Sequence, residues 1–229
     1  MKKITIYFFS AFTCSVFAKD NSIVMDKTRI IYRTQPSSLQ ITNNKEYPVL
    51  IQAGVWDEDN KKSTHFIATP PIFKMESSDK NIIRVVNIKK DFLSDRETLS
   101  WLCVESMPPV EKNTGIKRGN RTENISISIR GCIKLIYRPE SVSDPDYSEI
   151  AKFIAWKKGN GQITVTNTSP YYINFGAVKF DNTPMPEILY IKPFSKESYH
   201  TNARNISEVS WSMINDIGVK TIMNNTKLQ

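Results

Sequence analysis

The sequence predicts an all-β protein built from two β-sandwich domains, and three observations support this. After residue 18, short runs of alternating apolar and polar residues recur along the chain, separated by clusters of Asn, Asp, Pro and Ser. No helical periodicity persists for more than a turn or two, whereas short strands with turn signals at this spacing are typical of a sandwich. A seven-stranded sandwich takes about 100 residues, so the 211 residues that follow residue 18 fit two such domains.

The expected strands follow one another along the chain. They lie within the runs NSIVMDKTRIIY, SLQITN, PVLIQAGVW, IIRVVNI, TLSWLCVES, NISISIRGCIKLIY, GQITVTN, YYINFGAVKF, ILYIKP and VSWSMI. The β pattern is interrupted over residues 138–149, RPESVSDPDYSE, where two prolines with several acids and serines favour a linker. We therefore expect a first domain over residues 19–140 and a second over residues 148–229.

The first 18 residues have the layout of a secretory signal peptide. Two lysines precede an apolar run from Ile4 to Phe17, and we expect cleavage after Ala18. The alternative of a membrane anchor is weaker, because about 14 apolar residues fall short of the roughly 20 that a spanning helix needs. A lipoprotein is also disfavoured, since the residues before Cys14 lack the usual small side chain. The sequence thus predicts a secreted, soluble mature protein.

Charge and residue content argue against several classes of function. Loss of the two signal-peptide lysines lowers the formal net charge from +8 to +6, and the remaining basic residues are scattered, so nucleic acid is not expected as a partner. His65 and His200 are the only histidines, and the chain has no Gly-rich phosphate loop or CxxC metal spacing. We therefore expect no enzymatic activity, no cofactor and no metal.

Two cysteines remain in the secreted chain, Cys103 and Cys132. In an oxidising compartment they can form one disulfide, and the alternative is a pair of reduced core cysteines. If they face each other on neighbouring antiparallel strands, the same register places Glu105 opposite Arg130, a favourable pair of opposite charges. The bridge would close a loop of about 30 residues and stabilise the fold by roughly 3–4 kcal/mol.

The run NISISIRGCIKLIY, residues 124–137, is long for a single strand. Ile125, Ile127 and Ile129 lie beyond the cysteine, towards the tip of the predicted hairpin. These isoleucines either face the core of their own sandwich or form an apolar row on an edge strand that another protein extends by strand addition. Composition alone does not decide between the two.

The sequence resembles the PapD-like periplasmic chaperones of the chaperone–usher pathway, which escort fimbrial subunits to an outer-membrane usher. The resemblance covers almost the whole mature chain. It is carried by the blocks DKTRIIY, NNKEYPVLIQAGVWDE, FIATPPIFKME, DRETLSWLCVESMPP, CIKLIYRP, NTSPYYINF, KPFS and INDIG. The cysteine pair and the long tip are similar to the long-loop (FGL) subgroup. The resemblance implies two immunoglobulin-like sandwiches in a boomerang arrangement and a periplasmic location.

The resemblance also implies how a subunit is held. The family's anchoring pair falls on Arg29 and Lys134, which would bind the C-terminal carboxylate of a subunit, because a guanidinium fork and an ammonium are suitable donors. Its donor residues fall on Ile125, Ile127 and Ile129, which would fill the groove that a subunit leaves open for lack of its last strand. We thus expect one fimbrial or non-pilus adhesin subunit per chaperone, and donor-strand complementation as the mechanism.

Two further expectations concern the geometry of this site. The family's interdomain ion network falls on Glu97, Arg138 and Asp216, and would hold the angle between the domains. Lys134 has the opposite strand parity to the isoleucines, so we expect either strand twist or a β-bulge between Ile129 and Lys134, with Gly131 as a candidate site for the bulge. The alternative function is a subunit or adhesin of the same fibre, and the sequence does not decide whether the free chaperone self-associates through its exposed edge.

Overall fold

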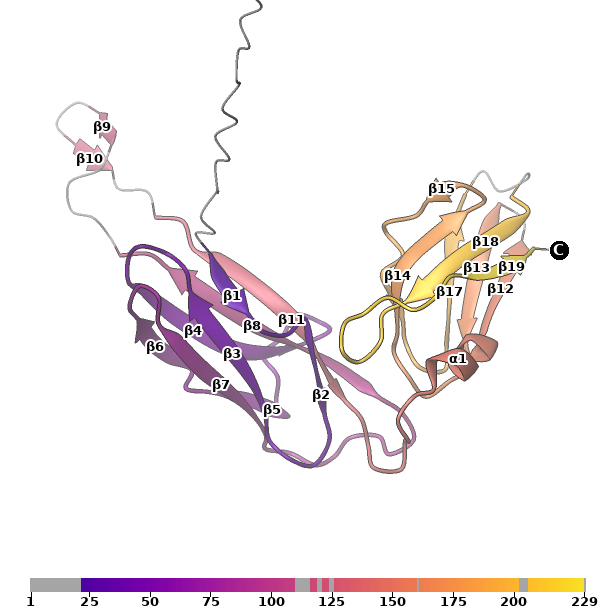
Figure 1. The fold of residues 1–229 in the computed structure, drawn as a ribbon, viewed down its shortest axis with the longest axis horizontal. Coiled ribbons are helices and arrows are strands. Elements are labelled where there is room, and N and C mark those ends of the chain that lie inside the picture. Colours follow the sequence, from indigo (N-terminus) through magenta and orange to yellow (C-terminus); the bar gives the residue numbers. More distant parts are fainter. Residues whose placement is uncertain are drawn as a thin grey trace, which may run out of the picture.

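A computed structural model describes residues 22–109, 116–118, 121–123, 126–159, 161–201 and 206–228. The chain forms two β-sandwiches that meet at an angle (Figure 1). The all-β, two-domain fold with immunoglobulin-like sheets, predicted from the strand pattern and the resemblance, is confirmed. The expected signal peptide, residues 1–18, lies outside the described part of the chain. No helix in the described part is long and apolar enough to cross a membrane.

The first domain packs two sheets against each other. One sheet has the strand order β1 (Ile23–Met25), β3 (Ser37–Asn43), β7 (Lys80–Asn87) and β5 (Phe66–Thr69). The other has the order β2 (Arg29–Tyr32), β11 (Ile129–Tyr137), β8 (Thr98–Met107), β4 (Val49–Asp57) and β6 (Ile72–Met75). Alternation along the sequence decides which side chains face inward. In β4, for example, Val49, Ile51, Ala53 and Val55 are all buried.

A small two-stranded ribbon projects from this domain. It consists of β9 (Ile116–Arg118) and β10 (Arg121–Glu123), which pair antiparallel. In Figure 1 the ribbon lies beyond the end of the first sandwich, on the side away from the second domain. It belongs to the connection between β8 and β11.

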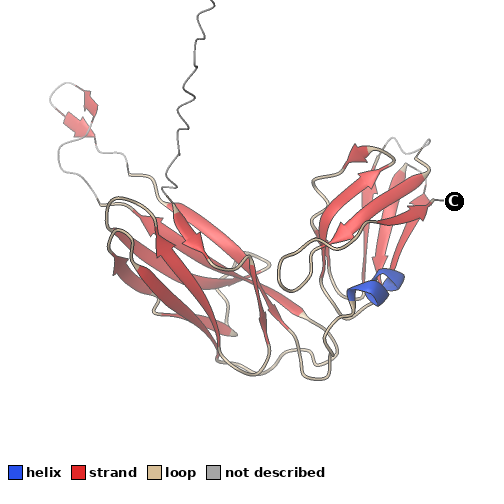
Figure 2. Ribbon diagram, in the orientation of Figure 1, coloured by secondary structure: helices blue, strands red, loops and turns tan. Residues whose placement is uncertain are grey.

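The second domain has a three-stranded sheet facing a larger one. The first contains β12 (Ile154–Gly159), β13 (Gln162–Asn167) and β17 (Ser195–His200). The second contains β15 (Thr183–Pro184), β14 (Ile173–Phe180), β18 (Glu208–Met213) and β19 (Asn224–Lys227), with β16 (Tyr190–Ile191) also paired to β14. Trp156, Phe175 and Trp211 pack together in its core. The link between the domains carries the short helix α1 (Tyr147–Ile150) and the 3-10 turn η1 (Ala151–Phe153), and the other regular elements of the described chain are strands joined by loops (Figure 2).

The register of β11 against β8 matches the sequence-based expectation. Cys132 lies opposite Cys103, and the two form a disulfide with a Cα–Cα distance of 4.0 Å. The pairing continues from Ile129 to Tyr137 without a shift, so of the two alternatives the bulge at Gly131 is wrong. A bulge is unnecessary because the cation and the apolar row act on opposite faces of one regular strand.

Candidate functional site

Strand β11 is paired along its whole length on one side and along only half of it on the other. β8 covers the full strand, whereas β2 runs parallel to β11 and pairs only with Lys134–Tyr137. On that side Ile129–Ile133 has no strand partner among the residues that the structure describes, since β1 belongs to the opposite sheet. This half of β11, the free edge, can hydrogen-bond an added strand.

An apolar row continues from the core of the first domain to the free edge. Ile133 and Leu135 are buried in the core, and Ile129 has the same strand parity but is 61% exposed. Ile127, just before the strand, is 71% exposed. The alternative that these two isoleucines pack in their own core is therefore wrong. Ile125 lies outside the described residues.

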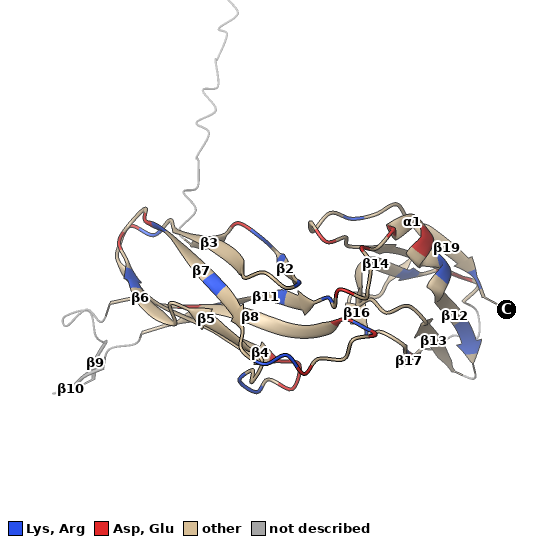
Figure 3. Cartoon of the chain, turned by 90° about the horizontal axis from the view of Figure 1, so that it is seen from below, with Lys and Arg blue, Asp and Glu red and all other residues tan. Residues whose placement is uncertain are grey.

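Two cations stand where the free edge ends. Arg29 is the first residue of β2, and its partner in the parallel register is Lys134 of β11. Figure 3 shows basic residues on β2 and β11 at the end of the first domain that faces the second. The structure thus brings the two predicted anchor residues together, at the inner limit of the edge that an incoming strand could occupy.

Lys134 is held between the domains and is partly desolvated. Its Nζ donates a hydrogen bond to Oδ1 of Asn174 in the second domain and lies 4.5 Å from the ring centroid of Tyr190. Burial, and then the charge of Arg29, lower the pKa of Lys134 to about 8, against the opposing effect of Glu58. The ammonium is therefore a charge that gains from a nearby anion.

Arg29 also has hydrogen-bonding capacity left over. Its Nη1 donates to the backbone oxygen of Ile214 at 3.3 Å, while its buried Nε has no partner among the described residues. Burial lowers the pKa of Arg29, with Tyr147 and Asp216 acting in the opposite direction. A buried donor without an acceptor costs about 1–3 kcal/mol. A bound carboxylate could accept charge-assisted hydrogen bonds from this guanidinium.

Arg29 opens onto a cavity of about 580 Å³ between the domains. One wall comes from residues 26–31 and 36–38 of the first domain, and the other from residues 216–218 of the second. The two walls approach each other closely at Gly218 and Thr28, where a Cβ on Gly218 would lie 2.6 Å from Oγ1 of Thr28. The cavity leaves room for the end of a polypeptide beside the guanidinium.

The three residues of the predicted ion network also meet. Arg138 is 2% exposed, and its Nε donates to Glu97 Oε1 at 2.7 Å. Its two terminal nitrogens donate to the two carboxylate oxygens of Asp216 at 2.8 and 2.9 Å. The second oxygen of Glu97 accepts from the backbone N–H of Tyr172 at 2.7 Å. The network therefore connects both domains through the linker.

The buried network shifts the pKa values of its members. Burial raises the pKa of Glu97, although the charge of Arg138 opposes this. Burial would lower the pKa of Arg138, but its hydrogen bonds to Asp216 and the charge of Glu97 raise it instead. At neutral pH the arginine is thus a permanent cation that holds two carboxylates.

Sequence reasoning missed several members of the interface. Asp144 accepts from Arg138 Nη1 at 3.0 Å and from Arg33 at 2.5 Å, and Tyr147 donates to Asp216 at 2.8 Å. The acids and the tyrosine of the linker were visible as a break in the β pattern. Nothing in that stretch indicated which of them faces the arginine.

A second interdomain cluster, centred on Glu58, was also missed. Its carboxylate accepts from the hydroxyls of Tyr172 and Tyr190 at 2.9 and 3.3 Å and pairs with Lys192 at 3.0 Å. Burial and then the charge of Glu58 raise the pKa of Tyr172. The pair of adjacent tyrosines before β14 was the one available signal, and it does not identify a partner more than 100 residues away.

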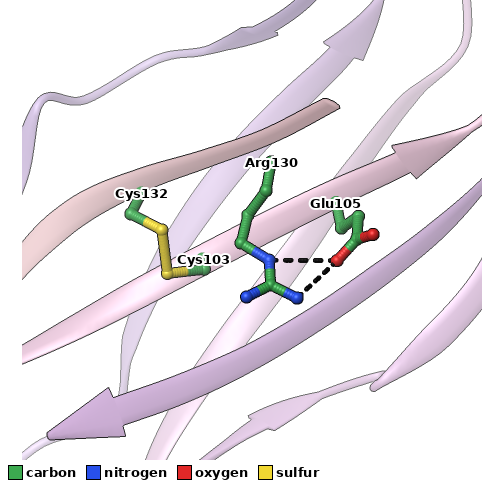
Figure 4. The surroundings of a disulfide bond; sticks show 4 residues. All are labelled: Cys103, Glu105, Arg130 and Cys132. Carbon is green, nitrogen blue, oxygen red and sulfur yellow. Dashed lines mark hydrogen bonds and ion pairs between the residues drawn. A yellow bond between two sulfur atoms is a disulfide. The ribbon is translucent and has the colours of Figure 1, made fainter. Parts of the chain in front are cut away.

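Side-chain contacts between β11 and β8 lie beside the free edge, on the face of β11 opposite the apolar row (Figure 4). Next to the disulfide, Arg130 donates twice to Glu105, at 3.0 and 2.7 Å, as the predicted register requires. The guanidinium also lies 5.0 Å from the ring centroid of Trp56. Hydrogen bonds from Arg130 lower the pKa of Glu105. These contacts hold β11 to β8 where its other side is unpaired.

The described residues contain no group of three or more His, Cys, Asp or Glu side chains that could hold a metal ion. Of the two histidines, His65 pairs with Asp91 at 2.9 Å, and its ring centroid lies 4.6 Å from that of Phe92. The chemistry that this geometry supports is binding of an anion and of an extended strand.

Comparisons with known proteins agree with this geometry. Residues 22–143 match the family described as pili and flagellar-assembly chaperone, PapD N-terminal domain, and residues 149–224 match pili assembly chaperone PapD, C-terminal domain. The chaperone protein CssC of Escherichia coli is 45% identical over 225 residues, covering 96% of this chain and 97% of that protein.

Two solved structures are similar over the whole described fold. One comes from the complex of the Salmonella enterica SafA pilin with the SafB chaperone, with 27% identity and a TM-score of 0.81, covering 93% of this chain and 99% of that one. The other is the E. coli chaperone DraB, with 29% identity and a TM-score of 0.79, covering 91% and 97%. Assignment to the long-loop subgroup stays a prediction.

Proposed function

The chain belongs to the PapD family of pilus-assembly chaperones, and we propose that it holds one fimbrial subunit by strand addition at the free edge of β11. The protein is a fimbrial chaperone of the chaperone–usher pathway and not an enzyme. In the proposed complex, the terminal carboxylate of the subunit binds Arg29 and Lys134. Ile127 and Ile129 enter the groove that the subunit leaves open.

One observation carries this proposal: the free edge ends at the two cations. A strand added along Ile129–Ile133 cannot continue further, because β2 occupies the same side of β11 from Lys134 onward. The end of the added strand must therefore lie beside Arg29 and Lys134. A C-terminus bears the carboxylate that these donors suit. Since the cations lie at the C-terminal limit of the free edge, the added strand runs parallel to β11.

The exposed isoleucines supply the apolar part of the binding energy. Full burial of an isoleucine is worth roughly 1.5–3 kcal/mol, so Ile127 and Ile129 together contribute about 3–6 kcal/mol before the costs of association. Ile125, whose placement the structure does not describe, belongs to the same proposed row. The carboxylate adds specificity for a chain end, because only an end can sit where the edge is blocked.

The proposal also includes the cellular location of the chaperone and a second binding partner, the usher. The apolar start of the chain directs it to the periplasm, with removal of residues 1–18, and the loaded chaperone delivers its subunit to an outer-membrane usher. The unpaired edge also supports self-association of the free chaperone, which a subunit would displace.

The test is capture of the subunit from the native periplasm. The tagged chaperone, Lys134→Ala and Arg29→Ala are purified, and co-purified proteins are identified by mass spectrometry. Lys74→Ala is the matched control, because Lys74 is an exposed lysine of β6 whose side chain forms an ion pair with Glu76. We expect a small secreted protein at one to one with wild type and control, and loss of it with both anchor variants. Undiminished recovery with Lys134→Ala would refute the anchor assignment.

A further inference from the structure

We propose that the side-chain amide of Asn174 positions the ammonium of Lys134, so that the second domain forms part of the carboxylate anchor. The inference rests on the proposed function, which places the anchor on Arg29 and Lys134 of the first domain. It adds a residue from the other domain and gives it a task that neither cation can perform alone.

The orientation of Asn174 is determined by its surroundings. The side chain is 4% exposed, and its Nδ2 donates to the backbone oxygen of Tyr172 at 3.2 Å. The amide oxygen is therefore the atom that faces Lys134, whose Nζ donates to it. The backbone oxygen of Asn174 accepts from the N–H of Ile214 at 2.7 Å. Ile214 in turn accepts from Arg29 through its own backbone oxygen, so one part of the second domain contacts both cations.

Aromatic rings and charged groups also surround the ammonium of Lys134. Tyr190 is the cross-strand neighbour of Asn174, and its ring lies close enough to Lys134 for a cation–π contact. The ring of Trp101, from β8, lies 5.8 Å away on the other side. The charged groups that act on the ammonium are Arg29 of β2 and Glu58, which directly follows β4.

A neutral acceptor suits this position better than an acid. A lysine ammonium has three N–H donors, and Asn174 takes one of them without neutralising the charge. The other two can meet a subunit carboxylate. A flexible lysine side chain loses about 2 kcal/mol of rotamer entropy when it is ordered. Because Asn174 already orders the side chain of Lys134 in the free protein, subunit binding does not include this loss. An aspartate of the same shape would pair with Lys134 and compete with the subunit.

The experiment compares Asn174→Asp and Asn174→Leu, which have nearly the same shape as asparagine and opposite effects on a cation. Lys134 is titrated by NMR through its ε-carbon in protein labelled with 13C-lysine, and its signal is assigned by its loss in Lys134→Arg. We expect Asn174→Asp to raise the pKa of Lys134 above its wild-type value of about 8, and Asn174→Leu to lower it. A role in packing alone would not shift the titration in opposite directions.

Subunit recovery is measured with the same variants. Because a hydrogen bond to a charged group is lost or redirected, we expect both to recover about tenfold less subunit than wild type. Asn174→Thr keeps a neutral acceptor oxygen and should retain most of the recovery. The matched control is Asn225→Asp, which makes the same change of charge at an exposed site in β19 of the same domain. Thermal unfolding identifies any variant that fails to fold.

The outcomes separate this inference from the proposed function. Wild-type titration of Lys134 in both variants, together with undiminished recovery, would overturn the role of Asn174. If the variants shift the titration but wild type itself recovers no subunit, the proposed function fails while Asn174 still positions Lys134. If recovery depends on Lys134 but not on Asn174, the anchor stands without the second domain and the inference is wrong.

Discussion

Replacing Arg138 by alanine should destabilise the chaperone severely. The arginine is almost completely buried and binds Glu97 and Asp216. Its removal leaves the Glu97 carboxylate buried with only the N–H of Tyr172 as a hydrogen-bond partner in the described network. Breaking a buried ion pair by removing one partner typically costs about 3–5 kcal/mol. For a chain of this length that corresponds to a melting temperature lower by roughly 6–20 °C.

The dependence of folding stability on pH tests why Arg138→Ala is less stable than wild type. Burial raises the pKa of Glu97 in the folded protein, so its ionisation disfavours folding. The contribution of the protonated Glu97 to stability is fully present below the unfolded-state pKa of 4.5. It is lost as the pH rises through the higher pKa of Glu97 in the folded protein. Arg138→Ala removes the charge that opposes this shift. The variant should therefore be further below wild type at neutral pH than at acidic pH.

Thermal unfolding and periplasmic abundance measure the effect. Arg96→Ala is the matched control, since its ion pair with Asp95 is exposed to solvent and contributes little to stability. Adding Glu97→Gln to Arg138→Ala removes the stranded charge and should restore about 1–3 kcal/mol. A single variant as stable and as abundant as wild type would refute the reasoning. A double variant no better than the single one would show that the buried carboxylate is not the cause.

Four other outcomes are expected. Subunit affinity should fall as the pH rises above about 8, because the lowered pKa of Lys134 leaves less ammonium for the carboxylate, and an equal affinity at about pH 9 would contradict this. Ile127→Asp should abolish subunit capture but change the stability of the free protein by no more than about 0.5 kcal/mol, since the side chain is exposed; an unfolded variant would place it in the core. Replacing both disulfide cysteines by serine should cost roughly 3–4 kcal/mol in chemical denaturation, whereas an unchanged midpoint would show that the bridge adds nothing. Gly218→Ala should lower the melting temperature more than Gly161→Ala, because both glycines have positive φ but only the first has Thr28 in the way; equal losses would leave backbone strain as the sole cause.

Much of the fold was predictable because it depends on local periodicity. Alternation of apolar and polar residues identified the strands, and the acidic, proline-containing stretch marked the break between the domains. The disulfide followed from secretion and an even cysteine count, and it then aligned Glu105 with Arg130 without further information. The expected bulge at Gly131 failed because the parity argument assumed that the cation and the isoleucines must act on one face of β11.

The sequence by itself determined the two sandwiches and the register of β11, and through the resemblance it predicted the residues at which a carboxylate and a donor strand would act. Only the tertiary structure decided that β2 begins at Arg29 and leaves half of β11 unpaired, that Asn174 accepts a hydrogen bond from Lys134, and that Glu58 joins the domains. Strand patterns repeat every two residues and can be read locally. The contacts between the domains join residues far apart in the chain, such as Arg138 with Asp216, and these exist only once both domains have folded.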